Sequence, residues 1–271
     1  MDRDTGQVVY TPERIGVADL PSPAGFSNDH PDESRMRVIE GSSYRDCSTI
    51  ALMPTRRKPG QEALHPKVAD AYRCLLVPMN QKFTAIRLAG MEVADAYNQG
   101  IAEVLRHPQL STWKFILTYE CDNTPPPDGL VKLIQTMYSG PWAAVGGLYW
   151  VKGESGMPMI YGNPLDPEIN FRPVVPEPET VQECRGVAMG FTLWDIGLFR
   201  DKRLGEPGPA TPWFKTLHDY QQGQGVSAAT QDLEFCGRAG ALGYRFAVDT
   251  RVRVGHVQFD ESPTHPAGFV W

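Results

Sequence analysis

The chain has 271 residues, of which 41% are hydrophobic and 21% are charged, and this balance excludes disorder throughout. Its formal net charge of −6 and its pI near 5.5 argue against a protein held on nucleic acid by bulk positive charge. No apolar run reaches the ~18 residues of a membrane-spanning helix, and the acidic start of the chain does not resemble a secretion signal, so we expect a cytoplasmic protein.

Residues 1–46 differ in composition from the rest of the chain. They are rich in Asp, Pro, Ser and Arg, and their few large apolar residues follow neither a helical nor a strand period. We therefore predict an extended arm over residues 1–46. Residues 47–271 are predicted to form one folded α/β domain.

Strand and helix patterns alternate through the first half of that domain. Short apolar runs predict strands, and apolar residues spaced three and four apart predict helices. Such alternation is typical of a mostly parallel sheet flanked by helices. The strands are predicted at residues 48–53, 75–78, 113–119 and 143–151, and the helices at residues 65–75, 91–106 and 128–137.

The second half of the domain is less regular. Residues 153–183 are dominated by Gly, Pro and Glu and are predicted as loops. After them we predict a strand at 186–194, a helix at 231–242, and terminal strands at 244–249 and 252–257.

Two acidic residues, Glu120 and Asp122, directly follow the predicted strand at 113–119. Open α/β sheets bind ligands at the carboxyl ends of their strands, and carboxylates there are the hard oxygen ligands that Mg²⁺ or Mn²⁺ prefers. The basic run at residues 54–58 follows the first strand and is suited to holding phosphates. Taken alone, the two acids also fit ordinary turn residues.

A distal motif adds weight to the metal interpretation. The segment 230–239, Thr-Gln-Asp-Leu-Glu-Phe-Cys-Gly-Arg-Ala, is followed by Val-Arg-Val-Gly-His at 252–256. Together with other segments in the same order, these motifs resemble those of glycosyltransferases with the GT-A fold, in particular the family-2-like group. The other matching segments are 50–56, 96–101, 116–123 and 185–193. Strings at 117–130, 145–153, 189–193 and 230–235 further resemble phage-type and environmental glycosyltransferases.

The resemblance implies a GT-A fold, a Rossmann-like nucleotide-sugar-binding domain. It also implies that a nucleotide sugar, with a UDP-sugar favoured, is the donor. The residues that would contact this donor are Thr55, Arg56, Asn98, Glu120 and Asp122.

The resemblance also implies a metal and a general base. Glu120, Asp122 and His256 would bind Mn²⁺ or Mg²⁺, which offsets the charge that develops on the leaving diphosphate. Asp232 would take the proton of the acceptor hydroxyl, giving a single displacement with inversion. From the residues alone, Asp232 also fits a helix cap and His256 an ordinary strand histidine.

Three positions depart from the family-2-like pattern. Gln231 stands where Glu is usual, although Gln is normal for the phage-type group. Cys121 lies between the two acids, where a third acid is common, and Tyr97 replaces an Arg. Trp150, Trp194 and Trp213 fit either the core or a stacking surface, and the sequence does not separate these alternatives.

The implied activity is metal-dependent transfer of a sugar, with glucose favoured, to an acceptor hydroxyl. The phage-type resemblance suggests the 5-hydroxymethyl group of a modified pyrimidine in DNA, in the cytoplasm of a phage-infected host cell, and the base would leave the stack. A saccharide, lipid or protein acceptor is the alternative. A nucleotidyltransferase is more remote because residues 54–60 lack its Gly-rich loop, and a non-catalytic binding module would have no use for the acids and histidine.

Overall fold

A computed structural model gives the structure of residues 45–55, 64–151, 156–165, 172–208, 210–221, 225–258 and 269–270. Its helices are α2 (Pro66–Cys74), α3 (Val93–Arg106), η3 (Leu110–Thr112), α4 (Gly129–Ser139), η4 (Ile196–Arg200) and α5 (Gln231–Ala241). Its strands are β1 (Thr49–Thr55), β2 (Phe83–Ala89), β3 (Phe115–Tyr119), β4 (Asn123–Thr124), β5 (Trp142–Leu148), β6 (Trp150–Val151), β7 (Met157–Pro158), β8 (Ile160–Tyr161), β9 (Val181–Cys184), β10 (Gly186–Val187), β11 (Phe191–Asp195), β12 (Leu217–Gln221), β13 (Gly225–Ala229), β14 (Arg245–Arg253), β15 (Gly255–Gln258) and β16 (Phe269–Val270).

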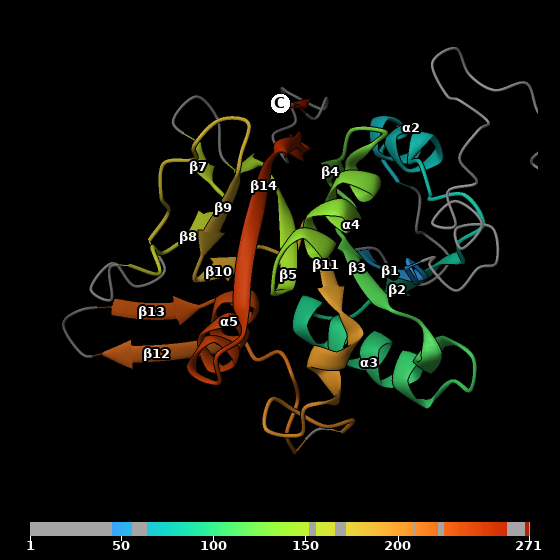
Figure 1. Ribbon diagram of the computed structural model, residues 1–271. Helices are drawn as coiled ribbons and strands as arrows, with labels where there is room; N and C mark the ends of the chain where they lie inside the picture. Colours follow the sequence, from blue (N-terminus) through green and yellow to red (C-terminus); the bar gives the residue numbers. More distant parts are fainter. Residues whose placement is uncertain are drawn as a thin grey trace, which may run out of the picture. The chain divides into compact units, whose positions relative to one another are not determined.

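A seven-stranded sheet in the order β2-β1-β3-β11-β5-β14-β9 forms the centre (Figure 1). The pairings β1–β2, β1–β3 and β5–β14 are parallel. β11 runs antiparallel to both β3 and β5, and β9 antiparallel to β14. Five strands therefore share one direction, and the predicted α/β fold with a mostly parallel sheet flanked by helices is confirmed.

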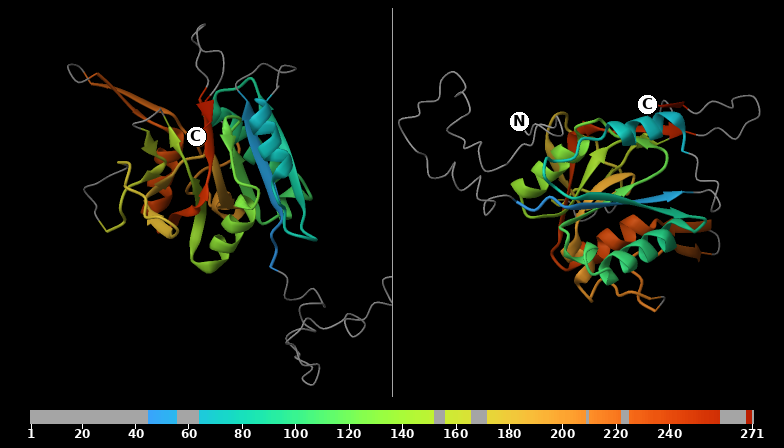
Figure 2. Two further views of the ribbon diagram at one scale, coloured as in Figure 1. Left: turned by 90° about the horizontal axis from the view of Figure 1, so that it is seen from above. Right: turned by 90° about the vertical axis from the view of Figure 1, so that its right-hand side faces the viewer.

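Helices cover both faces of the sheet. The right-hand view of Figure 2 shows α2 and α4 on one side and α3 and α5 on the other. Each side has its own apolar cluster: one joins Val68 of α2 to Leu133 of α4, and the other joins Ile101 of α3 to Phe235 of α5. The strands β1, β3 and β5 between them are buried on both faces, which explains why their sequences read as continuous apolar runs.

Side chains at both ends of α3 stabilise the helix termini. Glu92 precedes the helix, and its carboxylate accepts hydrogen bonds from the amides of Ala94 and Asp95. Arg106 lies in the last turn, where a cation is favourable beside the helix dipole. This helix therefore starts directly after the loop that follows β2, at the carboxyl edge of the sheet.

The predicted strand at residues 75–78 is wrong. This segment is extended but pairs with no strand; the Leu76 amide donates to the Pro127 carbonyl, and Leu76 is 55% exposed. Pro78 has no N–H to contribute to a ladder. The second strand is instead β2, an edge strand of mixed polarity that the apolar-run criterion did not detect.

The second half contains more strands than predicted. β7, β8 and β9 fall within or across the end of the predicted loop 153–183, and β9 is an edge strand of the main sheet. The predicted strand 186–194 is two strands, β10 and β11, separated by a turn at Gly190. The terminal strands correspond to β14 and β15 with shifted boundaries, and the paired β12 and β13 were not predicted.

Two predictions lie wholly or almost wholly outside the described residues. Of the predicted arm at 1–46, the structure describes only Arg45 and Asp46. Arg56, predicted to contact the nucleotide, also lies outside. Among the described helices, none combines the length and apolar character needed to cross a membrane.

Candidate active site

A cleft of about 510 Å³ opens at the carboxyl edge of the sheet. The ends of β1 and β3 and the first turns of α3 and α5 converge there, as expected for a ligand site in an open α/β sheet. The lining residues are Pro54, Thr55, Met91, Glu92, Val93, Glu120, Cys121, Asp122 and Gln231. The cleft thus brings together Thr55, both predicted acids and Gln231, the neighbour of Asp232. Asp232 and His256 do not themselves line it.

The acidic loop after β3 is fixed by its backbone. The Glu120 amide donates to the Gly190 carbonyl (3.0 Å), and the Asn123 amide donates to the Glu120 carbonyl (3.2 Å). The Val257 amide donates to the Asp122 carbonyl (2.6 Å). The bonds to Gly190 and Val257 join segments distant in sequence, so the tertiary structure holds the loop in place.

His256 lies beside Asp122. β15 pairs antiparallel with β4 so that His256 is opposite Asn123, and the His256 Nε2 atom is 3.7 Å from the Asp122 Oδ2 atom. The Nδ1 atom of His256 is buried and has no hydrogen-bond partner among the described residues. The ring stacks on Tyr149, with centroids 5.9 Å apart and planes 25° from parallel.

This donor set fits a divalent ion that is completed by its ligand. Among the described residues, no three His, Cys, Asp or Glu side chains form a preformed metal cluster. Asp122 supplies one carboxylate to the cleft, and His256, which does not line the cleft, supplies one imidazole beside Asp122. The Nδ1 atom of His256 has no hydrogen-bond partner among the described residues. Mg²⁺ and Mn²⁺ accept such partial sites, since phosphate oxygens and water fill the remaining positions.

Asp232 lies in the first turn of α5 and is 8% exposed. Its carboxylate accepts the Leu233 amide (2.9 Å) and a hydrogen bond from the Thr230 side chain. Burial nevertheless raises the pKa of Asp232 above its ordinary value, because those hydrogen bonds only partly offset the loss of water. Burial is the main cause that raises the pKa values of Tyr149 and Tyr161, and the nearby charge of Asp232 raises both further.

Thr55 is buried at the end of β1 with its hydroxyl oxygen directed to no described partner. A buried hydroxyl without a partner is uncommon, and it is available to a ligand in the cleft. Asn98 behaves differently. Its Nδ2 donates to the Phe214 carbonyl and its Oδ1 accepts the Phe214 amide, and it does not line the cleft. Asn98 thus makes a structural contact with Phe214, and its contact with the donor stays a prediction.

Sequence reasoning missed two residues at this site. Glu92 lines the cleft and caps α3. The sequence offered a signal for it, because a carboxylate stands directly before a strong amphipathic helix. Tyr149 stacks on His256 and accepts the Gly190 amide, and no local pattern marks it. Of the three tryptophans, Trp194 and Trp213 are core residues, whereas Trp150 is 36% exposed.

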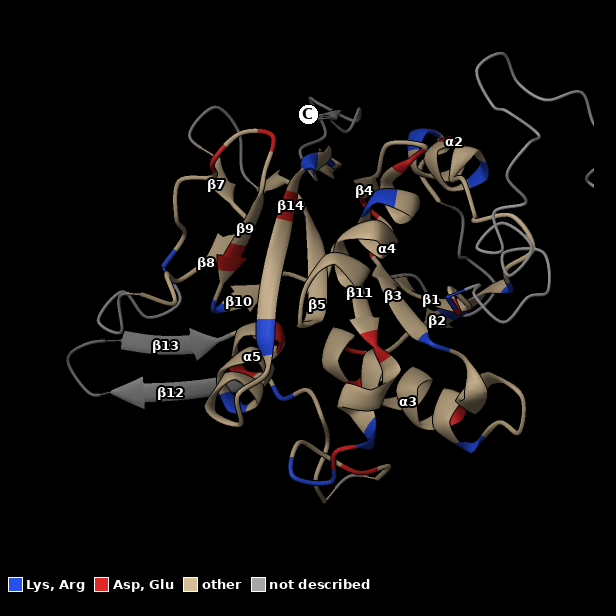
Figure 3. Cartoon of the chain, viewed as in Figure 1, with Lys and Arg blue, Asp and Glu red and all other residues tan. Residues whose placement is uncertain are grey.

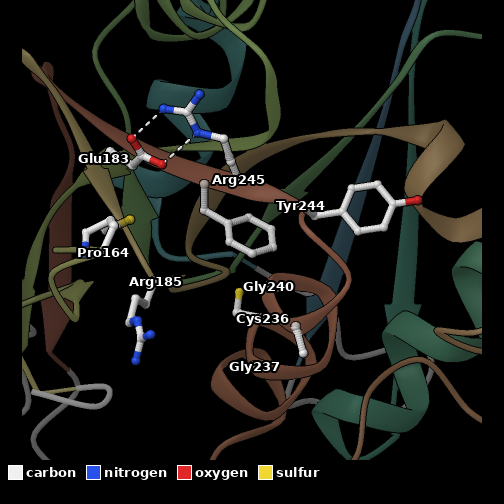
Figure 4. A pocket seen from close by; sticks show the side chains of 11 residues that line it. Pro164, Glu183, Arg185, Cys236, Gly237, Gly240, Tyr244 and Arg245 are labelled. Atoms are coloured by element: carbon white, nitrogen blue, oxygen red, sulfur yellow. Dashed lines mark hydrogen bonds and ion pairs between the residues drawn. The ribbon is translucent and has the colours of Figure 1, made fainter. Parts of the chain in front are cut away.

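A second cavity of about 450 Å³ lies between β9, α5 and the start of β14 (Figure 4). A salt bridge between Glu183 and Arg245 borders it, and Cys236 points into it. None of the predicted site residues lines this cavity, and the Tyr244 hydroxyl at its edge is already bonded to Asp201. We therefore place the candidate active site in the cleft at the carboxyl edge.

Charges of both signs are interspersed along the described elements. In the view of Figure 3, no helix or strand carries a continuous row of Lys and Arg. Several of these cations are paired, such as Lys114 with Asp195 and Arg238 with Glu234. Contact with a polyanion would therefore have to be local, as the net charge indicates.

The sequence matches no protein-family model and no curated protein. Among solved structures, the chain is similar to the crystal structure of A197 from STIV, at 13% identity and a TM-score of 0.50, over 82% of this chain and 93% of that one. It is also similar to the crystal structure of GalNAc-T7 with UDP, GalNAc and Mn²⁺, at 12% identity and a TM-score of 0.44, over 77% of this chain and 43% of that one. At these identities the likeness concerns the fold alone.

Proposed function

We propose that the protein is a metal-dependent, inverting glycosyltransferase that uses a nucleotide sugar. The observation that carries the proposal is the cleft, where Thr55, Glu120 and Asp122 meet the first turn of α5. The motifs that resemble GT-A glycosyltransferases contribute six of the nine residues at this cleft, namely Pro54, Thr55, Glu120, Cys121, Asp122 and Gln231, although the motifs are far apart in the sequence. A binding module would not require a buried carboxylate of raised pKa at Asp232, next in sequence to Gln231, which lines the same cleft as the acidic pair.

In the proposed site, the donor diphosphate lies over the acidic loop. Asp122 and His256 would hold Mn²⁺ or Mg²⁺, with Glu120 assisting, and Thr55 would donate its hydroxyl to the nucleotide. The metal would supply positive charge to the diphosphate as it leaves. A UDP-sugar is the favoured donor, with glucose as the favoured sugar.

Asp232 would act as general base on the acceptor side. Its burial raises its pKa, which makes it a stronger base than an exposed aspartate once it is ionised. The acceptor hydroxyl would give its proton to this carboxylate while its oxygen forms the new bond to the anomeric carbon. The bond from that carbon to the diphosphate breaks in the same step, so the configuration inverts.

The proposed acceptor is the 5-hydroxymethyl group of a modified pyrimidine in DNA. A flipped base would present a single hydroxyl on a short arm to the buried Asp232. The charges of both signs interspersed along the described elements call for local contacts to phosphate and not for a broad basic face. A saccharide, lipid or protein is the alternative acceptor, and the same site would serve it.

The decisive experiment supplies Mn²⁺, a panel of nucleotide sugars, and DNA with or without 5-hydroxymethylcytosine or 5-hydroxymethyluracil. Mass analysis of the digested nucleosides should show a hexose increment on the modified base. Asp122→Asn and Asp232→Asn should abolish the increment, whereas Asp128→Asn, the same change at a half-buried residue paired with Lys132, should keep it.

The other outcomes separate the alternatives. Free nucleoside diphosphate without modified DNA would contradict the DNA acceptor and retain the glycosyltransferase. Release of pyrophosphate would identify a nucleotidyltransferase. Binding of nucleotide sugar without any product, unchanged by Asp232→Asn, would favour a binding module.

A further inference from the structure

Tyr149 joins two parts of the site that are distant in the sequence. It follows β5, is almost fully buried, and stacks its ring on His256 with centroids 5.9 Å apart. Its hydroxyl accepts a hydrogen bond from the Gly190 amide (3.1 Å). The backbone is also fixed, since the Met159 amide donates to the Tyr149 carbonyl. One side chain thus contacts both the strand that carries His256 and the turn before β11.

Gly190 extends this contact to the acidic loop. Its carbonyl accepts the Glu120 amide (3.0 Å), so the Gly190 peptide groups connect the Tyr149 hydroxyl to Glu120. A Cβ atom at Gly190 would lie 2.6 Å from the Tyr149 hydroxyl and 2.8 Å from the Asn123 Oδ1 atom. Only glycine allows the tyrosine to approach the turn this closely, so the two residues act as a matched pair.

The other end of Tyr149 acts through His256. Its ring supports the face of the imidazole, whose Nε2 lies 3.7 Å from the Asp122 Oδ2 atom. Without this support the imidazole would have more freedom, because its Nδ1 makes no hydrogen bond among the described residues. Groups that orient metal ligands in this way typically contribute about 10–100-fold to metal affinity.

We propose that Tyr149 is the positioning residue of the donor site: its ring sets His256 beside Asp122, and its hydroxyl, through Gly190, sets Glu120. This inference rests on the proposed function. It assigns the metal-dependent part of donor binding to a residue outside the set of donor and metal contacts. The metal-independent part, the contact of the nucleotide with Thr55, should not depend on Tyr149.

The test is calorimetric titration with UDP, in Mn²⁺ and in EDTA, of the full chain and its variants. Tyr149→Leu should weaken UDP binding in Mn²⁺ by about 10–100-fold while leaving the affinity in EDTA unchanged. Tyr149→Phe keeps the ring and loses only the hydroxyl, so its loss in Mn²⁺ should be smaller, about threefold to tenfold. Tyr244→Phe, which loses one hydrogen bond to Asp201 beside the second cavity, should bind as the wild type does.

A double-mutant cycle separates positioning from general damage. If Tyr149 acts through His256, Tyr149→Leu should add little to the effect of His256→Ala in Mn²⁺. Full additivity, or an equal loss of affinity in Mn²⁺ and EDTA, would overturn the inference. If Tyr149→Leu does not melt cooperatively, Tyr149→Phe is the deciding variant. An affinity of Tyr149→Phe for UDP in Mn²⁺ equal to that of the wild type would overturn the inference. Absence of Mn²⁺-dependent UDP binding by the wild type would instead overturn the proposed function.

Discussion

Asn98 holds the Phe214 backbone from both sides, although 116 residues separate them in sequence. Its Nδ2 donates to the Phe214 carbonyl (2.8 Å), and its Oδ1 accepts the Phe214 amide (3.0 Å). This pair fastens the segment before β12 to α3, and the Phe214 ring packs against Tyr97 on the same helix. The helix that begins at the cleft is therefore anchored by a side chain that the motif resemblance assigns to the donor.

Asn98→Ala should lower stability and leave donor binding intact. Removing the side chain leaves two backbone groups of Phe214 unpaired, which costs about 1–3 kcal/mol. Thermal melting should show a loss of about 2–4 °C per kcal/mol. Gln99→Ala, which loses only a bond to Glu103 on the exposed face, is the control. A selective rise in the Kd of UDP without a change in Tm would restore the donor-binding role of Asn98.

Asp232→Asn should separate activity from stability. The amide cannot take the acceptor proton, so turnover should fall by about 10²–10⁴-fold. The variant should nevertheless melt no lower than the wild type at neutral pH, because an uncharged side chain avoids the cost of burying a carboxylate while its oxygen can still accept the Leu233 amide. Steady-state kinetics and melting of the same preparation check both parts. A large fall in Tm would indicate a structural role.

The pH dependence of Asp232 has a definite sign. Burial raises its pKa, so the folded state binds this proton more tightly than the unfolded state. The stability that protonated Asp232 contributes is fully present below the pKa of Asp232 in the unfolded state. It is lost as the pH rises through the pKa of Asp232 in the folded state. The Tm advantage of Asp232→Asn should therefore shrink as the medium is acidified.

Turnover should respond to the same titration. The rate of the wild type should fall on acidification at a higher pH than an ordinary aspartate would give, because the base must be ionised. The titratable groups that face Asp232 are Tyr149, Tyr161 and Cys236, whose own pKa values are raised, and they stay neutral over this range. A pH–rate profile of kcat/KM is the measurement, and a flat acidic limb would contradict the assignment.

Gly190→Ala should destabilise the protein by about 1–3 kcal/mol, because the new methyl group meets Tyr149 and Asn123 at less than 3.0 Å. Gly240→Ala is the matched control. Gly240 lies in α5, where an added Cβ meets nothing within 4 Å, so the same change should stabilise by about 0.5–1 kcal/mol. Denaturant unfolding of both variants measures the difference, and equal effects would contradict the close approach at Gly190.

Tyr97→Phe and Tyr149→Phe should change stability in opposite directions. The Tyr97 hydroxyl is fully buried and has no hydrogen-bond partner among the described residues, and an unsatisfied group of this kind costs about 1–3 kcal/mol, so its removal should stabilise. The Tyr149 hydroxyl accepts the Gly190 amide, so its removal leaves that amide unpaired and should destabilise. Melting curves at one pH compare the two. A loss of stability in Tyr97→Phe would show that its hydroxyl has a partner.

Sequence patterns predicted the strands that are buried on both faces and the helices that bury one apolar stripe. β1, β3 and β5 appear as apolar runs, and α3, α4 and α5 appear as apolar stripes, because those patterns report the burial of one segment. The edge strands β2 and β9 were missed because most of their side chains are only partly buried, so their sequences include polar residues and form no apolar run.

The sequence by itself determined the alternation of strands and helices, the position of Glu120 and Asp122 after a buried strand, and Asp232 at the start of a helix. Only the tertiary structure decided which of these side chains meet. The register of β15 on β4 brings His256 to Asp122, and the turn at Gly190 brings Tyr149 to the acidic loop. It also directs Asn98 away from the cleft to Phe214. The physical reason is that a periodic pattern reports how one segment is buried, whereas a site depends on pairings between segments distant in the sequence.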